Sequence, residues 1–200
     1  MSTAQSHSRP TGLAVWLIIA GAIGWSAAFA LTMDRLNLLE NPGSVASCDF
    51  SPLVQCTKNL ESWQGAVFGF PNPILGLAGW VAPIVVGMAI LAHARFARWF
   101  WWLFEAGMLF AFGFVIWLIG QSIFILGTLC PWCMVTWSVT IPTFYAVTLH
   151  VVRAGLVPAP AGLRRGADTL MSWVPLLAVV SYAVIAILAQ VRLDVLGALF

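Results

Sequence analysis

Five long apolar segments recur along the chain, and short polar stretches separate them. They cover residues 12–33, 74–92, 99–126, 131–152 and 171–191. A helix needs roughly 20 residues to cross the hydrocarbon core of a bilayer, so each segment has a suitable length. Their apolar positions are continuous instead of alternating, which favours helices over the strands of a membrane barrel. The pattern predicts an all-α integral membrane protein: a four-helix transmembrane bundle followed by a fifth transmembrane helix.

The composition agrees with a protein that is surrounded by membrane lipids. Of the 200 residues, 61% are hydrophobic and 8% are charged, whereas soluble domains carry about 25% charged residues. The 11 tryptophans and 13 phenylalanines suit the aromatic belts of a bilayer protein. The net charge is only +2 and no basic patch is interleaved with aromatic residues, which argues against a nucleic-acid partner.

The distribution of basic residues predicts the orientation of the chain, because cytoplasmic loops of membrane proteins are enriched in lysine and arginine. With a cytoplasmic N terminus, the inner side holds six arginines: Arg9, Arg95, Arg98, Arg153, Arg164 and Arg165. The outer side then holds three basic residues: Arg35, Lys58 and Arg192. This excess predicts that the N terminus lies inside and the C terminus outside.

The predicted spans divide the chain into several parts. A cytoplasmic tail (1–11) precedes the bundle (12–152), which includes an outer cap loop (34–73). A cytoplasmic connector (153–170) rich in proline, glycine and arginine leads to the fifth helix and an outer tail (171–200). The bundle with its cap loop is expected to be the working unit, with the fifth helix as an accessory.

The first apolar segment also has features of a signal peptide. Arg9 precedes it, and the sequence Ala28-Phe29-Ala30 resembles a cleavage site. However, the run is longer than the apolar core of a signal peptide, which has about 7 to 15 residues. A retained first span is therefore the preferred interpretation.

The cap loop is expected to contain a short amphipathic helix over residues 57–69. Leu60, Trp63 and Val67 recur at three- and four-residue spacing and would share one face of such a helix. This face could pack against the end of the bundle.

Four cysteines form two close pairs in the sequence. Cys48 and Cys56 fall in the cap loop, and Cys130 and Cys133 begin the fourth span within the sequence CPWC. Pro131 suits the first turn of a helix, and the backbone N–H groups at that end favour a reactive thiolate at Cys130. All four cysteines are predicted on the outer side, where disulfides are permitted.

The number of cysteines alone fits a structural brace as well as it fits catalysis. A zinc site is disfavoured, because zinc ligands are usually spaced as C-x2-4-C, whereas seven residues separate Cys48 from Cys56. The three histidines, His7, His93 and His150, are all predicted on the inner side, away from the cysteines. No metal is therefore expected.

The order of these motifs resembles the vitamin K epoxide reductase family, and in particular its bacterial members. The resemblance covers about residues 12–152 and is carried by CDFSPLVQC (48–56), ESWQG (61–65), FGFPNPILGL (68–77) and CPWC (130–133). It implies a four-helix bundle around a quinone, menaquinone or ubiquinone, with the outer loop as its cap. It also implies a multi-pass protein of the bacterial inner membrane with its active site on the periplasmic side.

The resemblance assigns a role to each cysteine pair. Cys130 and Cys133 would form the active-site pair, and Cys48 and Cys56 the shuttle pair that receives electrons from a thioredoxin-fold (DsbA-type) envelope protein. Many bacterial members carry such a domain after the fifth span, whereas this chain ends at Phe200, which implies a separate partner or a truncated chain. The expected activity is quinone-dependent oxidation of protein thiols. The alternatives are reduction of a vitamin K quinone or epoxide, and a disulfide-braced scaffold without catalysis.

Three further residues are candidates for quinone binding. Asn72 matches the family asparagine that hydrogen-bonds a quinone oxygen, although Pro-Asn-Pro is also an ordinary turn and helix-entry signal. Trp137 stands where animal members of the family have a tyrosine, and its indole N–H can donate a hydrogen bond. Trp63 is expected to pack in the cap and to line the mouth of the pocket.

Overall fold

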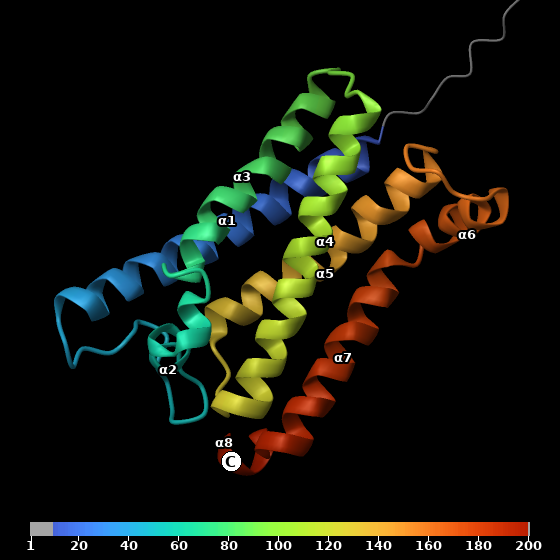
Figure 1. The fold of residues 1–200 in the computed structure, drawn as a ribbon. Helices are drawn as coiled ribbons and strands as arrows, with labels where there is room; N and C mark the ends of the chain where they lie inside the picture. Colours follow the sequence, from blue (N-terminus) through green and yellow to red (C-terminus); the bar gives the residue numbers. More distant parts are fainter. Residues whose placement is uncertain (1–9, 200) are drawn as a thin grey trace, which may run out of the picture.

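A computed structural model describes residues 10–199, and most of them lie in helices (Figure 1). The helices are α1 (Thr11–Glu40), α2 (Thr57–Glu61), the 3-10 helix η1 (Trp63–Ala66), α3 (Asn72–Leu91), α4 (Arg98–Gly120), the π-helix η2 (Gln121–Leu126), α5 (Pro131–Arg153), α6 (Ala161–Met171), α7 (Val174–Leu193) and α8 (Val195–Leu199). Within residues 10–199, five spans are long and apolar enough to cross a membrane, and α4 forms one of them together with η2. The predicted all-α membrane fold is confirmed. Arg9 and the preceding residues of the predicted tail lie outside the described residues.

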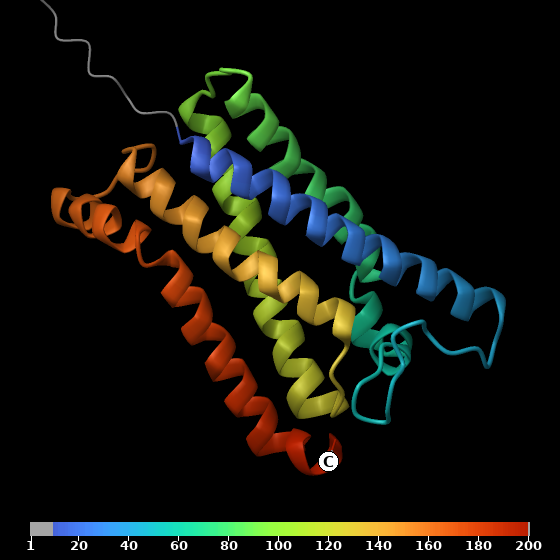
Figure 2. The ribbon, with the colours of Figure 1, turned by 180° about the vertical axis from the view of Figure 1, so that it is seen from behind.

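The helices α1, α3, α4 and α5 form the bundle, and α7 lies along its edge (Figures 1 and 2). The helix α5 is central, because it contacts α1, α4, α6 and α7. Half of its most apolar stretch is buried, compared with 11% for α7. Leu17, Val86, Trp101 and Val147, one from each bundle helix, belong to a buried apolar cluster. The bundle is thus built around α5, and α7 is peripheral to it.

Small residues allow α1 and α3 to approach each other closely, as is common between membrane helices. Gly24 of α1 lies against the indole ring of Trp80 in α3, and a Cβ atom at Gly24 would overlap that ring. Gly87 of α3 lies in the same way against the backbone carbonyl of Ala14. The position of Trp80 therefore depends on the absence of a side chain at Gly24.

The first helix is longer than the predicted span 12–33, because α1 continues to Glu40. It therefore includes the start of the segment predicted as the cap loop, 34–73. Hydropathy locates the edge of the hydrocarbon core, but polar residues can extend a helix beyond that edge. The helix ends where Pro42 and Gly43 follow, the latter with a positive φ of 94°.

The helix predicted over residues 57–69 is present as two short pieces, α2 and η1. Ser62 separates them with an extended backbone conformation, ψ 157°. The break changes the direction of the side chains that follow it, so Trp63 and Leu60 do not share one face: Leu60 is buried and Trp63 is exposed.

The predicted connector, 153–170, contains a helix that the sequence pattern did not indicate. The helix α6 begins after Pro160 and packs on α5. Ala167 is buried, whereas Leu163 and Leu170 are exposed. The glycines and prolines of this segment indicated a loop, but a helix can start directly after a proline.

The loop after α1, the short helices α2 and η1, and the turn between η2 and α5 lie together at one end of the bundle (Figures 1 and 2). We call this the cap end. The π-helix η2 stops at Gly127, whose positive φ of 66° turns the chain towards residues 128–130 and the start of α5. All four cysteines lie at this end.

Candidate active site

A disulfide joins Cys48 and Cys56 in the cap, with 5.7 Å between their Cα atoms. Both residues are buried. The carboxylate of Asp49 accepts hydrogen bonds from the backbone N–H groups of Cys56, at 2.7 Å, and Thr57, at 3.1 Å. Asp49 therefore caps the first turn of α2 and fixes Cys56 at the start of that helix.

Backbone hydrogen bonds tie this loop to the entry of α5. The N–H of Leu129 donates to the carbonyl of Leu53 at 2.8 Å, and the N–H of Gln55 donates to the carbonyl of Leu129 at 3.1 Å. The side-chain amide of Asn59 adds a hydrogen bond to the hydroxyl of Thr128 at 2.8 Å. These contacts bring the loop pair of cysteines to the CPWC sequence, which is far away along the chain.

The sulfur of Cys130 lies 3.1 Å from the sulfur of Cys56. Cys130 is the N-cap of α5, and its Sγ accepts a hydrogen bond from the backbone N–H of Cys133 at 3.3 Å. Pro131 occupies the first turn of α5, as predicted. Cys130 is completely buried, and the sulfur of Cys56 is its neighbour.

An apolar shell surrounds the sulfur atoms. Leu31 and Leu38 of α1 and Leu60 of α2 pack in one buried cluster with Cys48, Cys56 and Cys130. Cys133 packs at the edge of this cluster and is only partly buried. Water is thus kept away from the contact between the two cysteine pairs.

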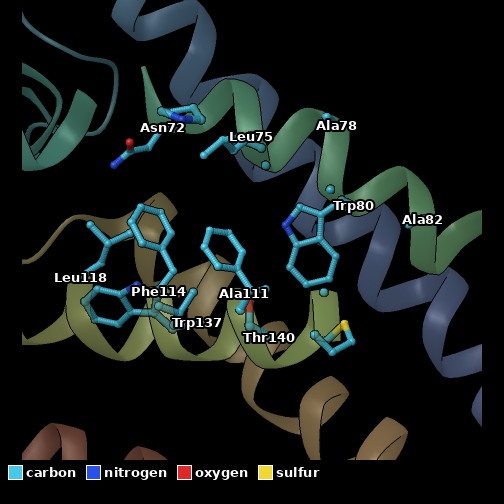
Figure 3. Close-up of a pocket in the computed structure, with 18 of the residues that line it drawn as sticks. Asn72, Leu75, Ala78, Trp80, Ala82, Ala111, Phe114, Leu118, Trp137 and Thr140 are labelled. Atoms are coloured by element: carbon cyan, nitrogen blue, oxygen red, sulfur yellow. The ribbon is translucent and has the colours of Figure 1, made fainter. Parts of the chain in front are cut away.

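A cavity of about 990 Å³ lies among the bundle helices and reaches the cap. Cys133 and Trp137 of α5 form part of its wall. Figure 3 shows side chains of α3, including Trp80, facing Phe114 of α4 across the cavity. The lining is apolar over most of its length. Polar side chains come mainly from the cap, the start of α3 and η2: Asn59, Ser62, Gln64, Asn72, Gln121 and Ser122.

Asn72 is the first residue of α3 and lines the cavity at the cap end (Figure 3). Its Nδ2 donates a hydrogen bond to the backbone carbonyl of Gln64 at 2.6 Å, and its Oδ1 accepts one from the backbone N–H of Val67 at 3.2 Å. The second N–H of the Asn72 amide makes no hydrogen bond within residues 10–199. Asn72 is therefore both a helix-entry residue and part of the cavity wall.

The two tryptophan candidates occupy different environments. Trp137 is 5% exposed and lines the cavity next to Cys133. Trp63 is 67% exposed, and its ring lies 5.9 Å from that of Trp117. The cavity lining contains Trp63's neighbours Ser62 and Gln64 but leaves Trp63 itself outside. Of the two, the structure places only Trp137 at the candidate site.

Three polar residues of the site were not anticipated from the sequence: Asp49, Asn59 and Gln64. Asp49 lies within CDFSPLVQC and Gln64 within ESWQG. The sequence of these motifs does not show that the carboxylate of Asp49 accepts backbone N–H groups or that the amide of Gln64 is buried. Gln121 was also missed, although a glutamine inside a membrane-spanning segment is a signal, because polar groups there usually face the protein interior.

Cys48, Asp49 and Cys56 lie close enough together to be considered as metal ligands. The two sulfur atoms are bonded to each other, however, and the Asp49 carboxylate already accepts two backbone N–H groups. Thiolates are the form of cysteine that binds metals. This arrangement fits disulfide chemistry and not a metal centre.

A multi-pass helical bundle that holds a disulfide against a free thiol, with a second thiol in the wall of an apolar cavity, has the architecture of a membrane disulfide oxidoreductase. Residues 15–148 match the family model of the vitamin K epoxide reductase family. The match extends over more than half of the chain, and the chain belongs to this family. No curated protein sequence gives a significant match.

Proposed function

We propose that the protein is a quinone-dependent thiol oxidoreductase that reoxidises a thioredoxin-fold partner for disulfide formation in exported proteins. The observation that carries the proposal is the 3.1 Å contact between the sulfur atoms of Cys56 and Cys130, with Cys133 next in line on the cavity wall. This arrangement supports a path for electrons from the loop pair to the helix pair and then to a ligand in the cavity.

The first exchange takes electrons from the partner. A thiolate of the partner attacks Cys48, and Cys56 leaves as a thiolate; the second thiol of the partner then resolves the mixed disulfide and releases Cys48. The partner is oxidised, and Cys48 and Cys56 become thiols. Because Cys48 is only 3% exposed, the loop that carries it must move for this step.

The second exchange transfers the electrons to the helix pair. The Cys56 thiolate attacks Cys130 in the Cys130–Cys133 disulfide, and Cys133 leaves as a thiolate. Cys48 then attacks Cys56, which re-forms the loop disulfide and releases Cys130. Disulfide Cys48–Cys56 with free Cys130 and Cys133, the arrangement in this structure, is the product of this exchange.

The cavity fits a lipid-soluble quinone on the basis of its donor set. Amide and hydroxyl groups gather at the cap end beside Cys133, and the remainder of the lining is apolar. A bound quinone would supply an acceptor for the two electrons and two protons that Cys130 and Cys133 lose when they form a disulfide. Asn72 and Trp137 would contact its ring, and the apolar walls would surround its chain.

Turnover by the purified protein tests this proposal. A reduced thioredoxin-fold dithiol protein is mixed with the protein in lipid nanodiscs, with or without 2-methyl-1,4-naphthoquinone, and thiols are counted over time. We expect oxidation of the dithiol only when both the protein and the quinone are present. Equal rates without quinone would contradict the assignment of the acceptor, and no oxidation at all would favour a structural brace.

We also propose that the cap end faces the periplasm across the bacterial inner membrane, which the excess of arginines at the opposite end supports. Single cysteines introduced into a cysteine-free variant test the orientation. Val45→Cys in the cap loop should react with a membrane-impermeant thiol reagent in intact cells. Ala94→Cys and Gly162→Cys, at exposed positions towards the other end, should react only after lysis. Labelling of Gly162→Cys in intact cells would reverse the orientation.

A further inference from the structure

Two glutamine side chains meet at the cap end of the cavity. Gln64 of η1 is 3% exposed, and its Nε2 donates a hydrogen bond to Oε1 of Gln121, the first residue of η2, at 3.2 Å. Both residues line the cavity. The Oε1 atom of Gln64 is buried and has no hydrogen-bond partner among the residues that the structure describes. A buried acceptor without a donor is unfavourable and calls for a partner that the protein itself does not supply.

The amide pair can present either a hydrogen-bond acceptor or a donor to the cavity. In the orientation described, the free atom is Oε1 of Gln64. If both amides turn by 180°, Nε2 of Gln121 donates to Oε1 of Gln64, and Nε2 of Gln64 becomes the free atom. A quinone oxygen accepts hydrogen bonds, whereas the hydroxyl of the reduced ring donates them. The pair therefore has a complementary form for each redox state of such a ring.

Asn72 holds Gln64 in this position. Its side-chain amide bonds the backbone carbonyl of Gln64 at 2.6 Å and the backbone N–H of Val67 at 3.2 Å. Much of the hydrogen-bonding capacity of Asn72 is thus used to anchor η1. Gln64, by contrast, has an unused polar atom in the same part of the cavity wall.

We propose that the Gln64–Gln121 amide pair binds an oxygen atom of the quinone ring and accommodates both its carbonyl form and its hydroxyl form. Gln64 makes the contact, and Gln121 and Asn72 position it. This proposal rests on the quinone-dependent function described above. The amide pair would give the quinone ring a polar contact at the cap end of a cavity whose lining is mostly apolar.

Binding of three small aromatic probes tests the proposal without any turnover. The probes are 2-methyl-1,4-naphthoquinone, which accepts hydrogen bonds, 2-methyl-1-naphthol, which donates one, and 2-methylnaphthalene, which has no oxygen. Binding is measured in nanodiscs by quenching of the tryptophan fluorescence, since Trp80 and Trp137 line the cavity. The variant is Gln64→Met, which keeps a similar length but removes the amide. Gln55→Met is the matched control, because that side chain bonds the carbonyl of Pro52 and lies outside the cavity lining.

We expect Gln64→Met to weaken binding of the quinone and of the naphthol by about 3- to 10-fold, the factor for one hydrogen bond. Binding of 2-methylnaphthalene should change by less than about twofold, and Gln55→Met should leave all three affinities unchanged. If Gln64→Met does not fold, Gln121→Met should give losses in the same direction, because it removes the group that orients Gln64.

The outcomes separate this proposal from the function on which it depends. If the parent protein binds the quinone and Gln64→Met binds it equally well, the amide pair has no role and the proposed function is unaffected. If only the quinone loses affinity and the naphthol does not, the claim that the pair serves both forms is wrong. If the parent binds none of the probes, the cavity is not a quinone site and both proposals fail.

Discussion

The loop pair, Cys48 and Cys56, and the helix pair, Cys130 and Cys133, are held in place by different kinds of contact. In the loop, side-chain acceptors fix the residues next to the cysteines, and backbone hydrogen bonds with Leu129 fix the loop against α5. Asp49 binds the backbone N–H of Cys56, and Asp34 of α1 binds both the N–H and the hydroxyl of Ser47, next to Cys48. At the start of α5, the helix itself fixes the two cysteines one turn apart, and the N–H of Cys133 bonds the sulfur of Cys130.

This difference matches the two steps proposed for the pairs, exchange with a protein partner and transfer of electrons to a ligand. The segment around Cys48 is held by the side-chain contacts of Asp34, whereas Cys56 is also tied to the start of α5 by backbone hydrogen bonds. In the proposed mechanism, displacement of the Cys48 segment lets a protein partner reach its buried sulfur. The helix pair lies at the start of the central helix α5, and Cys133 lines the cavity, which suits the proposed transfer of electrons to a ligand there. The contact between Cys56 and Cys130 connects the two.

The largest expected effect comes from Cys133→Ala, which breaks the connection between the pairs and the cavity. Quinone-dependent turnover should fall to the rate of a protein-free control. Cys130 is left without its local partner and lies 3.1 Å from Cys56, so it should attack Cys56 and release Cys48. Acid quenching, digestion and mass spectrometry should identify a Cys56–Cys130 disulfide and a free Cys48. A folded variant that keeps Cys48–Cys56 and a free Cys130 would show that the pairs do not exchange.

The sequence predicted the membrane fold directly, whereas for the cysteine pairs it predicted only that both lie on the outer side of the membrane. Continuous apolar runs define the spans directly, since a bilayer requires them. The register of Leu53–Gln55 against Leu129, which places Cys56 beside Cys130, could not be derived. It depends on backbone contacts between segments that are distant in sequence, and no local pattern encodes such a contact. The roles of Cys48, Cys56, Cys130 and Cys133 as a relay remain predictions.

The cap was harder to predict than the spans, because a single residue changes its geometry. The expected continuous helix over residues 57–69 placed Leu60 and Trp63 on the same face. The break at Ser62 separates them, so that Trp63 is exposed and Gln64 is buried in the cavity wall. Ser62 is the N-cap of η1, an extended position that serine favours, but a serine within an amphipathic run does not by itself mark a break in the helix. The backbone conformation of this one residue thus determines which side chains of the cap enter the site.

The next effect concerns the cavity that the helix pair faces. In Gly24→Ala, the new Cβ atom overlaps the ring of Trp80 and forces it towards the cavity that it lines. We expect the free energy of unfolding to fall by about 1 to 3 kcal/mol, as for other overpacked sites, and quinone affinity to fall with it. Thermal unfolding and probe quenching measure the two effects.

Gly113→Ala is the matched control for this change, because a Cβ atom at Gly113 meets nothing within 4 Å. The alanine should be neutral or slightly stabilising in the helix α4. Exchange between Cys56 and Cys130 should persist in both variants. Equal stability and quinone affinity in Gly24→Ala and the parent would mean that Trp80 can move without cost.

A smaller effect is expected from loosening the loop pair alone. Asp49→Ala removes the acceptor for the N–H groups of Cys56 and Thr57, which should cost about 1 kcal/mol, as for other helix caps. Exchange of Cys56 with Cys130 should slow, whereas quinone affinity should be unchanged. The test is the rate at which the mixed disulfide accumulates in a Cys133→Ala background. Asp49→Asn retains one acceptor oxygen and should restore most of the rate; if it behaves like alanine, the charge of Asp49 matters more than its hydrogen bonds.

The smallest effect is expected at Trp63, which belongs to neither pair nor to the cavity lining. Its side chain is 67% exposed and meets the ring of Trp117 at 5.9 Å. Trp63→Ala should therefore change stability by no more than about 0.5 kcal/mol, as is usual for exposed positions, and quinone affinity by less than about twofold.

Trp137→Ala is the informative contrast, since loss of a buried tryptophan costs about 3 to 5 kcal/mol and opens the cavity wall beside Cys133. Probe quenching in the two variants decides which tryptophan belongs to the site, and a large loss of affinity in Trp63→Ala would mean that the cap closes over the ligand in a way that brings Trp63 inside.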